Sequence, residues 1–140
     1  MSFDWTDYLD FAYRLYDIPE SPKLEGLSEA TYRSAASRAY YATFHCALDF
    51  ACKEGFQPSG GGEDHWRLRM HFKDFPHGGK AHRKIAKDLD NLRRYRKEVD
   101  YDDAFKEQQP RSKAFWAIRT ATSILETLDS IVPAKDDADS

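Results

Sequence analysis

The sequence predicts an all-α protein, an up-and-down four-helix bundle with an extra short helix or loop between the second and third long helices. Along the 140-residue chain, apolar residues recur at intervals of three and four, which is the spacing of helices that bury one face. No stretch alternates apolar and polar residues for long enough to form a strand. Prolines and glycines, which interrupt helices, separate the periodic segments.

A chain of this length is expected to form one domain around a single core. Hydrophobic residues make up 41% of the sequence, which is enough for a packed core despite the 32% of charged residues. We expect the bundle to span residues 1–133 and the acidic residues 134–140 to form a disordered tail.

The first two helices are predicted from their apolar faces. The first ends before Pro19, and its stripe consists of Trp5, Tyr8, Leu9, Ala12, Leu15 and Tyr16. The second runs from Glu29 to Glu54. It is apolar or small on nearly every side, so we expect it to be the central helix of the bundle.

The remaining helices follow breaks in the chain. Residues 55–62, GFQPSGGG, form a surface loop, and a weaker helix follows from Glu63 to Phe75. After residues 76–79, the third long helix carries the stripe Ala81, Ile85, Leu89, Leu92 and Val99. The fourth begins at Pro110 and ends before Pro133, with the stripe Ala114, Ala117, Ile118, Ala121, Ile124 or Leu125, Leu128 and Ile131.

Charge is distributed unevenly along the chain. The net charge of −3 excludes a generally basic surface, yet residues 80–98 hold eight basic and three acidic residues. Residues 4–25 have the opposite balance, with six acidic and two basic residues. We therefore expect the positive potential that attracts a polyanion to be confined to the third long helix.

The cysteines and the absence of long apolar runs bear on the compartment. Cys46 and Cys52 are six residues apart in a predicted helix, which separates their Cα atoms by roughly 9 Å. This is too far for a disulfide, so we expect free thiols packed in the core. With no signal-peptide pattern and no apolar run of transmembrane length, the simplest expectation is a reducing cytoplasm and no membrane partner.

Nucleotide-loop and metal motifs are missing from the sequence. The glycines at 60–62 follow no predicted strand and lack the Gly-Lys-Ser/Thr end of a phosphate-binding loop. No two histidines are four residues apart and neither cysteine joins one in a short motif, so no metal and no cofactor are expected. Gly78-Gly79-Lys80, before the basic helix, is better placed for an anion, with a simple helix-start turn as the alternative.

Three polar residues stand out in the second helix. Arg38, His45 and Asp49 share one side, at spacings of seven and four, among alanines and aromatic residues. Polar side chains in such surroundings need partners. One interpretation is a hydrogen-bonded network that fixes the packing of the bundle, and the other is that Arg38 lines a binding cleft.

The segment LRRYRKEVDYDD, residues 92–103, holds the most informative position. Continuing the apolar stripe of the third helix by helical steps reaches Arg96, where the pattern requires an apolar side chain. An inward arginine demands an explanation. Arg93, Arg94 and Lys97 fall on other sides of the helix, where they are either phosphate contacts or ordinary solvated charges.

Two stretches together resemble the HEPN superfamily of small helical bundles: YRSAASRAYYATFHCALDF in the second helix and LRRYRKEVDYDD near the end of the third. The resemblance covers nearly the whole chain. It is closest to the bacterial and archaeal branch with an Arg-x-x-Ala-Asp-Tyr signature, which here is Arg96-Lys97-Glu98-Val99-Asp100-Tyr101, with valine for alanine. The resemblance implies a homodimer packed through its long helices and, in many members, a metal-independent ribonuclease at the dimer cleft.

The resemblance also implies a catalytic pattern, and the sequence departs from it. The ribonucleases of the superfamily pair an arginine, which holds the scissile phosphate, with a histidine four to six residues later that moves protons near neutral pH. Arg96 matches the arginine, but Asp100 and Tyr101 stand where the histidine is expected. These three residues are the catalytic candidates, with His45 or His82 as possible substitutes from other helices.

The expected function is binding of RNA, or of a partner that carries a nucleotide, at a dimer cleft around Arg96, in a defence or toxin–antitoxin system. Lys80, Arg93, Arg94 and Lys97 are the expected binding residues of the basic helix, with Arg38, His45 and Asp49 from the second helix. Two alternatives remain open. One is a metal-independent endoribonuclease with a rearranged proton-transfer group, and the other is a non-catalytic interaction module that partners a nucleotidyltransferase, as other members of the superfamily do.

Overall fold

The computed structural model describes residues 7, 9, 10, 12, 14, 27–76, 78–101 and 109–133. Within these residues the regular structure is helical and contains no strand, which confirms the predicted all-α class. The helices whose bounds are described are α2 (Leu27–Lys53), α3 (Asp64–Asp74), α4 (Lys80–Tyr101) and α5 (Gln109–Ser130). Residues 7, 9, 10, 12 and 14 are also helical, and Leu9 and Ala12 are buried.

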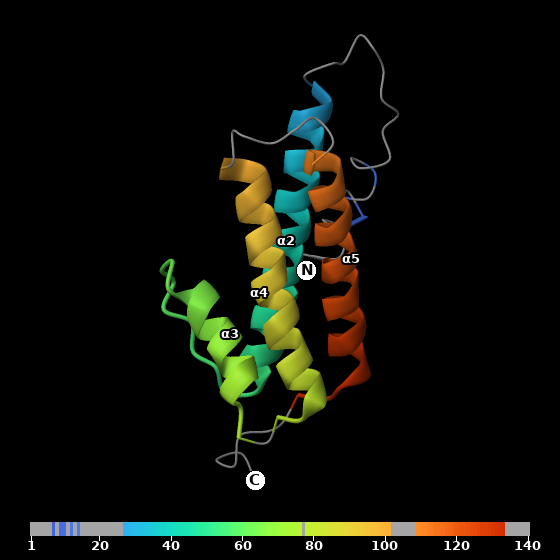
Figure 1. Ribbon diagram of the computed structural model, residues 1–140. Helices are drawn as coiled ribbons and strands as arrows, with labels where there is room; N and C mark the ends of the chain where they lie inside the picture. The colour runs from blue at the N-terminus through green and yellow to red at the C-terminus, as the bar shows by residue number, and fades with distance from the viewer. Residues whose placement is uncertain are drawn as a thin grey trace.

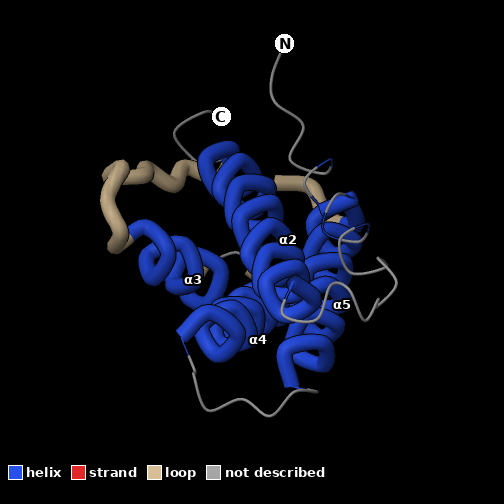
Figure 2. The backbone as a smooth tube through the Cα atoms, turned by 90° about the horizontal axis from the view of Figure 1, so that it is seen from above, coloured by secondary structure: helices blue, strands red, loops and turns tan. Residues whose placement is uncertain are grey.

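The three long helices run side by side and form the body of the bundle (Figure 1). Viewed along their axes, α2, α4 and α5 occupy the corners of a triangle, and α3 lies beside α2 and α4 (Figure 2). The short helix α3 is therefore the extra element that the sequence predicts between the second and third long helices. The predicted bounds of α2 and α3 differ from the observed ones by one or two residues.

Small side chains allow the long helices to approach closely. Alanines of α2 and α5 are fully buried in the core at nine of the described positions: Ala35, Ala36, Ala39, Ala42, Ala47, Ala51, Ala114, Ala117 and Ala121. Larger residues fill the space between them, with Ile85 and Leu92 from α4 and Ile118 and Ile124 from α5 almost completely enclosed. Each such side chain contributes roughly 1.5–3 kcal/mol through burial. The predicted stripes are thus confirmed as core faces over Ile85–Leu92 in α4 and Ala114–Leu128 in α5, whereas Ala81 and Ile131 are only half-buried.

A glycine ends the central helix. Gly55 adopts a positive φ of 99°, a backbone conformation that residues with a Cβ rarely take. The chain then turns back, and the backbone N–H of Phe56 donates to the carbonyl of Ala51 over 3.0 Å. This turn satisfies the last carbonyls of α2 and starts the loop that leads to α3.

Several predictions lie outside the described residues. These are the end of the first helix before Pro19, the side chains of Val99, Asp100 and Tyr101, and the disordered tail at residues 134–140. Among the described helices, none combines the length and the apolar character required to cross a lipid bilayer. Both cysteines are free, as predicted, but Cys52 is exposed at the surface instead of packed in the core, because it lies on the outer side of the last turn of α2.

Candidate nucleic-acid interface

Arg96 lies against two tyrosines of the central helix. Its guanidinium carbon is 4.9 Å from the ring centre of Tyr40 and 4.9 Å from that of Tyr41. The two rings meet at 81°, so the cation sits in the notch between them, and its Nη2 donates to the Tyr41 hydroxyl over 3.3 Å. Each cation–π contact stabilises by roughly 0.5–1 kcal/mol at a partly exposed site. The arginine that interrupts the apolar stripe of α4 is therefore held in place by aromatic rings.

The buried Tyr40 connects this arginine to a histidine of α3. The Tyr40 hydroxyl forms a hydrogen bond with Nδ1 of His65, whose ring stacks on Phe44 with centroids 4.0 Å apart. His65 shares one face of α3 with Leu68 and Phe72, which are buried. The packing of α3 on α2 therefore places His65 beside Arg96, whereas neither His45 nor His82 has a described contact with that arginine.

Burial and neighbouring charges determine the protonation of Tyr40 and His65. Burial raises the pKa of Tyr40 to about 12, against the opposing effect of Arg96 and two further arginines, so its hydroxyl stays protonated. Burial, and then Arg96, lower the pKa of His65, which favours a neutral imidazole. We assign the donor role in this hydrogen bond to the Tyr40 hydroxyl, because it has no other acceptor among the described residues. The single ring proton of His65 is then on Nε2, where it can be donated to a ligand.

Two more arginines surround this pair, and both share one carboxylate. Nη1 of Arg69, on α3, lies 2.7 Å from Oδ1 of Asp90, and Nη2 of Arg93 lies 3.5 Å from the same oxygen. Both arginines also lower the pKa of Tyr40, which locates their charge close to the Tyr40–His65 pair. The Nε atoms of Arg69 and Arg93 are buried and have no hydrogen-bond acceptor among the described residues. Such donors are costly unless a ligand or water satisfies them.

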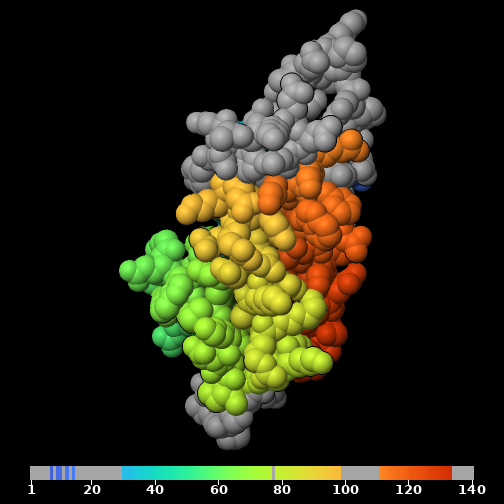
Figure 3. All heavy atoms as spheres, in the orientation of Figure 1, coloured from blue at the N-terminus to red at the C-terminus, as the bar shows by residue number. Residues whose placement is uncertain are grey.

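We refer to Tyr40, Tyr41, His65, Arg69, Arg93 and Arg96 as the arginine site. It is built from α2, α3 and α4, and α4 forms the middle of the face shown in Figure 3, between α3 and α5. Of the residues predicted from sequence, Arg93 and Arg96 belong to this site. His65 and Arg69 were missed.

The other predicted residues of the basic helix are more dispersed. Arg94 is exposed and lies 3.8 Å from Asp90, and Lys97 is exposed on the outer side of α4. Lys80 is exposed at the first position of the helix, about 24 Å from Arg96 along an axis that rises about 1.5 Å per residue. The structure therefore does not bring Lys80 into the arginine site.

The predicted polar set of α2 is also divided. Arg38 is half-buried one turn before Tyr41. His45 contacts Phe44 edge-on, on a different side from His65, and burial lowers its pKa against the opposing charge of Asp49. Asp49 is exposed and lines a separate pocket. Arg38, His45 and Asp49 thus do not form one described network.

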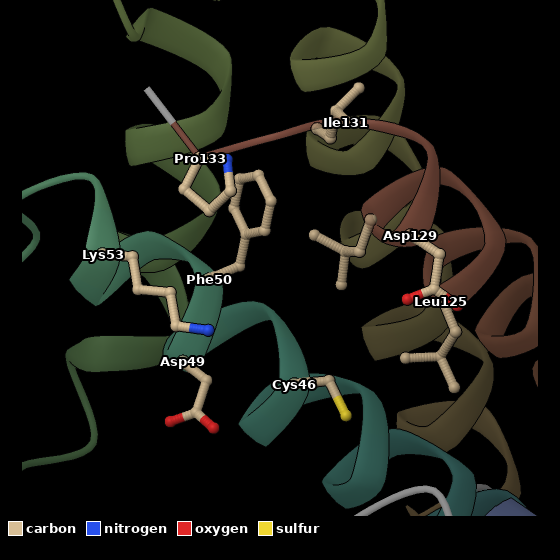
Figure 4. A pocket seen from close by; sticks show the side chains of 9 residues that line it. Cys46, Asp49, Phe50, Lys53, Leu125, Asp129, Ile131 and Pro133 are labelled. Carbon is tan, nitrogen blue, oxygen red and sulfur yellow. The ribbon is translucent and has the colours of Figure 1, made fainter. Parts of the chain in front are cut away.

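That pocket lies between the C-terminal halves of α2 and α5 and has a volume of about 350 Å³. Figure 4 shows Cys46 and Asp49 on α2 opposite Leu125 and Asp129 on α5. Its polar groups are two carboxylates, one lysine and a thiol, over an apolar floor, and they provide no arrangement of donors for phosphate. The pocket is distinct from the arginine site.

A second polar cluster lies inside the bundle and was also missed from sequence. The buried carboxylate of Glu54 lies 3.0 Å from Nε2 of His71 and 2.8 Å from Nε2 of His82. An ionised carboxylate only accepts hydrogen bonds, so both Nε2 atoms donate to it. Phe75 stacks on His82, and Gly78 packs so closely that an added Cβ would lie 3.0 Å from that histidine. The cluster joins the end of α2 to α3 and to the start of α4.

The glycine loop before α3 is closed by its own aspartate. Asp64 accepts hydrogen bonds from the backbone N–H and hydroxyl of Ser59, at 2.9 and 2.8 Å, and from the N–H of Gly60 at 2.8 Å. Arg67 adds an ion pair at 2.9 Å. These interactions hold the pKa of Asp64 at about 2. The loop amides that a phosphate would require are therefore already engaged.

Within the described ranges, no three histidine, cysteine or acidic side chains are arranged to hold a metal ion. Comparison of the chain with protein-family models, with curated proteins and with solved structures gives no match.

Proposed function

We propose that this chain is a HEPN-type bundle that binds single-stranded RNA at the arginine site. One observation carries the proposal: Arg96 lies over Tyr40, which bonds to His65, while Arg69 and Arg93 meet at Asp90 and their charges lower the pKa of the same tyrosine. Guanidinium groups suit phosphate because they present several N–H donors in one plane.

The aromatic residues favour a single strand over a duplex. Tyr41 is 40% exposed beside Arg96, and Trp66, the residue that follows His65 in α3, is 58% exposed. Proteins that bind single strands combine a positive surface with exposed rings on which bases stack, and each stacked base contributes roughly 1–3 kcal/mol. Paired bases in a duplex are not available for this contact.

Binding is better supported than cleavage. When Tyr40 donates to Nδ1, the proton of neutral His65 is on Nε2, so the ring is a hydrogen-bond donor and not a general base toward the ligand. Endoribonuclease activity is the second candidate. His65 lies near Arg96 in space, although no histidine follows Arg96 within a few residues in the sequence. RNA cleavage in the presence of a chelator, abolished by His65→Gln, would establish the second candidate over the first.

Dimer formation is part of the proposal. The outer face of α5 exposes Phe115 and Trp116, whose rings contact edge-on at 5.5 Å, with Arg119 over Phe115 at 5.7 Å. Large apolar residues exposed together on a helix often mark a protein interface. Pairing of the outer face of α5 with a second copy would leave the arginine site, which lies on α2, α3 and α4, accessible.

Charge removal tests the proposal. The double variant Arg69→Gln and Arg93→Gln should weaken binding of a labelled oligouridine at least tenfold in fluorescence anisotropy, because two phosphate contacts are lost. Arg83→Gln is the matched control, since Arg83 is an exposed arginine on the same helix α4. Equal affinity of the double variant and the parent protein would remove the arginine site as the RNA-binding surface.

A further inference from the structure

We propose that Asp90 is an internal competitor for the phosphate groups of RNA. Its carboxylate holds arginines that the RNA needs, and these arginines must leave it before a phosphate binds. This inference rests on the proposed function and specifies how the arginine site is regulated. Removal of the Asp90 charge should therefore strengthen RNA binding, whereas removal of a residue that positions the arginines would weaken it.

The carboxylate of Asp90 lies among guanidinium groups from two helices. Nη1 of Arg69, on α3, lies 2.7 Å from Oδ1, and Nη2 of Arg93, on α4, lies 3.5 Å from the same oxygen. Nε of Arg94, also on α4, lies 3.8 Å from Oδ2. One carboxylate thus occupies the point where three guanidinium groups meet, and this is the position that suits a phosphate.

The surroundings of Asp90 allow a ligand to take its place. Its side chain is 41% exposed, so a phosphate can approach the same guanidinium groups from solvent. Among the described residues, that side chain interacts with these arginines and with no hydroxyl or backbone N–H donor. Asp64, in contrast, is buried and is fixed by Ser59 and Gly60. Asp90 is therefore held by partly exposed ion pairs, which contribute little to stability and are screened by salt.

A strand that replaces Asp90 gains interactions that the carboxylate lacks. Its successive phosphates release bound counterions when they meet arginines. Its bases can also stack on exposed rings such as those of Tyr41 and Trp66. The carboxylate supplies a single charge and stays attached to α4. It opposes the strand in two ways, because the arginines must leave it and because its charge then lies near the incoming phosphate.

Asp90 also stabilises the free protein. Its ion pair with Arg69 joins α3 to α4, and without the carboxylate the three guanidinium groups would repel one another. Removal of the charge should therefore lower stability while it raises RNA affinity. A residue that only positions the arginines would lower both, so the opposite signs distinguish the two roles.

Asp90→Asn removes the charge and keeps the size of the side chain. Its affinity for a labelled oligouridine, measured by fluorescence anisotropy at low salt, should rise about fivefold, which corresponds to about 1 kcal/mol. Its melting temperature without RNA should fall by about 3 °C. An affinity that is unchanged or lower would contradict the inference, and RNA binding by the parent protein would still stand.

Asp88→Asn is the matched control for the loss of one negative charge. Asp88 lies two residues earlier in α4, which places it on another side of the helix, and its carboxylate lies 2.7 Å from Nζ of Lys84. The RNA affinity of this variant should stay within about twofold of the parent value. An equal gain in both variants would attribute the effect to overall charge and overturn the specific role of Asp90.

A further variant links the gain to the arginines themselves. When Asp90→Asn is added to the double variant Arg69→Gln and Arg93→Gln, the carboxylate has lost two of its three partners. The substitution should then change RNA affinity by less than about twofold, because the interaction that it removes is mostly absent already. A fivefold gain that persists in this background would contradict competition for these arginines.

Inorganic pyrophosphate separates this inference from the RNA proposal. It supplies phosphate groups without bases, so it should raise the melting temperature of Asp90→Asn more than that of the parent protein. That result, combined with no RNA binding by either protein, would overturn the RNA proposal and keep Asp90 as a competitor for phosphate. Equal stabilisation of the two proteins by pyrophosphate would overturn the inference.

Discussion

The guanidinium of Arg96 lies over the ring of Tyr40, whose hydroxyl in turn bonds to His65. One buried tyrosine therefore links a cation of α4 to an imidazole of α3. Arg96 affects the protonation of both partners, since it opposes the raised pKa of Tyr40 and contributes to the lowered pKa of His65. The site therefore depends on how α3 packs on the bundle. The residues that define the resemblance to HEPN proteins, in contrast, lie in α2 and α4.

Arg96→Met should separate a functional arginine from a structural one. Loss of the contacts with Tyr40 and Tyr41 should cost about 1 kcal/mol or somewhat more of unfolding free energy, because the site is partly exposed. RNA affinity should fall more, by roughly tenfold to 150-fold, since a charged hydrogen bond contributes about 1.5–3 kcal/mol. Urea denaturation and anisotropy measure the two effects. A variant that loses 3 kcal/mol or more of stability yet binds RNA as the parent does would make Arg96 a scaffold residue.

The Tyr40 hydroxyl predicts a dependence of stability on alkaline pH. Its pKa is about 12 in the folded protein and about 10 in the unfolded chain, so the folded state holds the proton more tightly. The stability from this group is complete below pH 10 and is lost as the pH rises from 10 to 12. Absorbance at 295 nm should show an ionisation near pH 12 that Tyr40→Phe removes and Tyr41→Phe retains. Absence of that difference would contradict the assigned environment.

Glu54→Gln tests the cluster that joins α2, α3 and α4. The substitution removes a buried negative charge that accepts from both His71 and His82, and the expected loss of unfolding free energy is roughly 3 kcal/mol. Denaturant unfolding measures it. Glu126→Gln, at an exposed position of α5, is the matched control and should be nearly neutral. Equal stability of the two variants would show that the cluster contributes little.

The loop aspartate predicts a dependence of stability on acidic pH. Hydrogen bonds from Ser59, together with those from Gly60 and Arg67, lower the pKa of Asp64 from 3.8 to about 2. Its contribution to stability is therefore present above pH 4 and is lost as the pH falls toward 2. Asp64→Asn should melt at a lower temperature than the parent protein at pH 6. The difference between the two melting temperatures should be smaller at pH 2. A difference that stays constant between these pH values would argue against the ionised carboxylate as the stabilising group.

The aromatic pair of α5 predicts the oligomeric state. Light scattering at micromolar concentration should give a particle of twice the 16.2 kDa chain mass. Trp116→Glu places a charge in the proposed interface and should yield monomers. Trp66→Glu, at an exposed tryptophan of α3, should remain dimeric. A parent protein that is monomeric throughout this concentration range would remove the dimer from the proposal.

The helices were predictable because their signal is local. The apolar stripes Ile85, Leu89, Leu92 and Ala114, Ala117, Ala121 became buried faces, since a period of 3.6 residues decides which side of a helix is covered. The same argument identified Arg96 as a residue that faces another helix. It could not identify Tyr40 and Tyr41 as its partners, because contacts between α2 and α4 depend on how the helices are rotated against each other.

His65 was missed for a related reason. Its role requires α3 to pack on α2, and the spacing of residues within α3 does not predict against which helix α3 packs. A signal was nevertheless present: His65 lies three and seven residues before Leu68 and Phe72, so it continues their buried stripe, as His82 continues that of Ile85. A histidine at an apolar position of a helix indicates a partner from another element. Glu54 and His71 gave no such indication, being 17 residues apart in the chain.

The salt dependence of RNA binding tests the central claim most directly. For an oligouridine of about ten nucleotides, the logarithm of the association constant should fall linearly with the logarithm of salt concentration, with a slope of about −2. That slope corresponds to about three phosphate contacts, the number that Arg69, Arg93 and Arg96 provide, and it should become shallower by about 0.7 when one of them is replaced by glutamine. No measurable binding at low salt, or a slope that the replacement does not change, would contradict RNA binding at the arginine site.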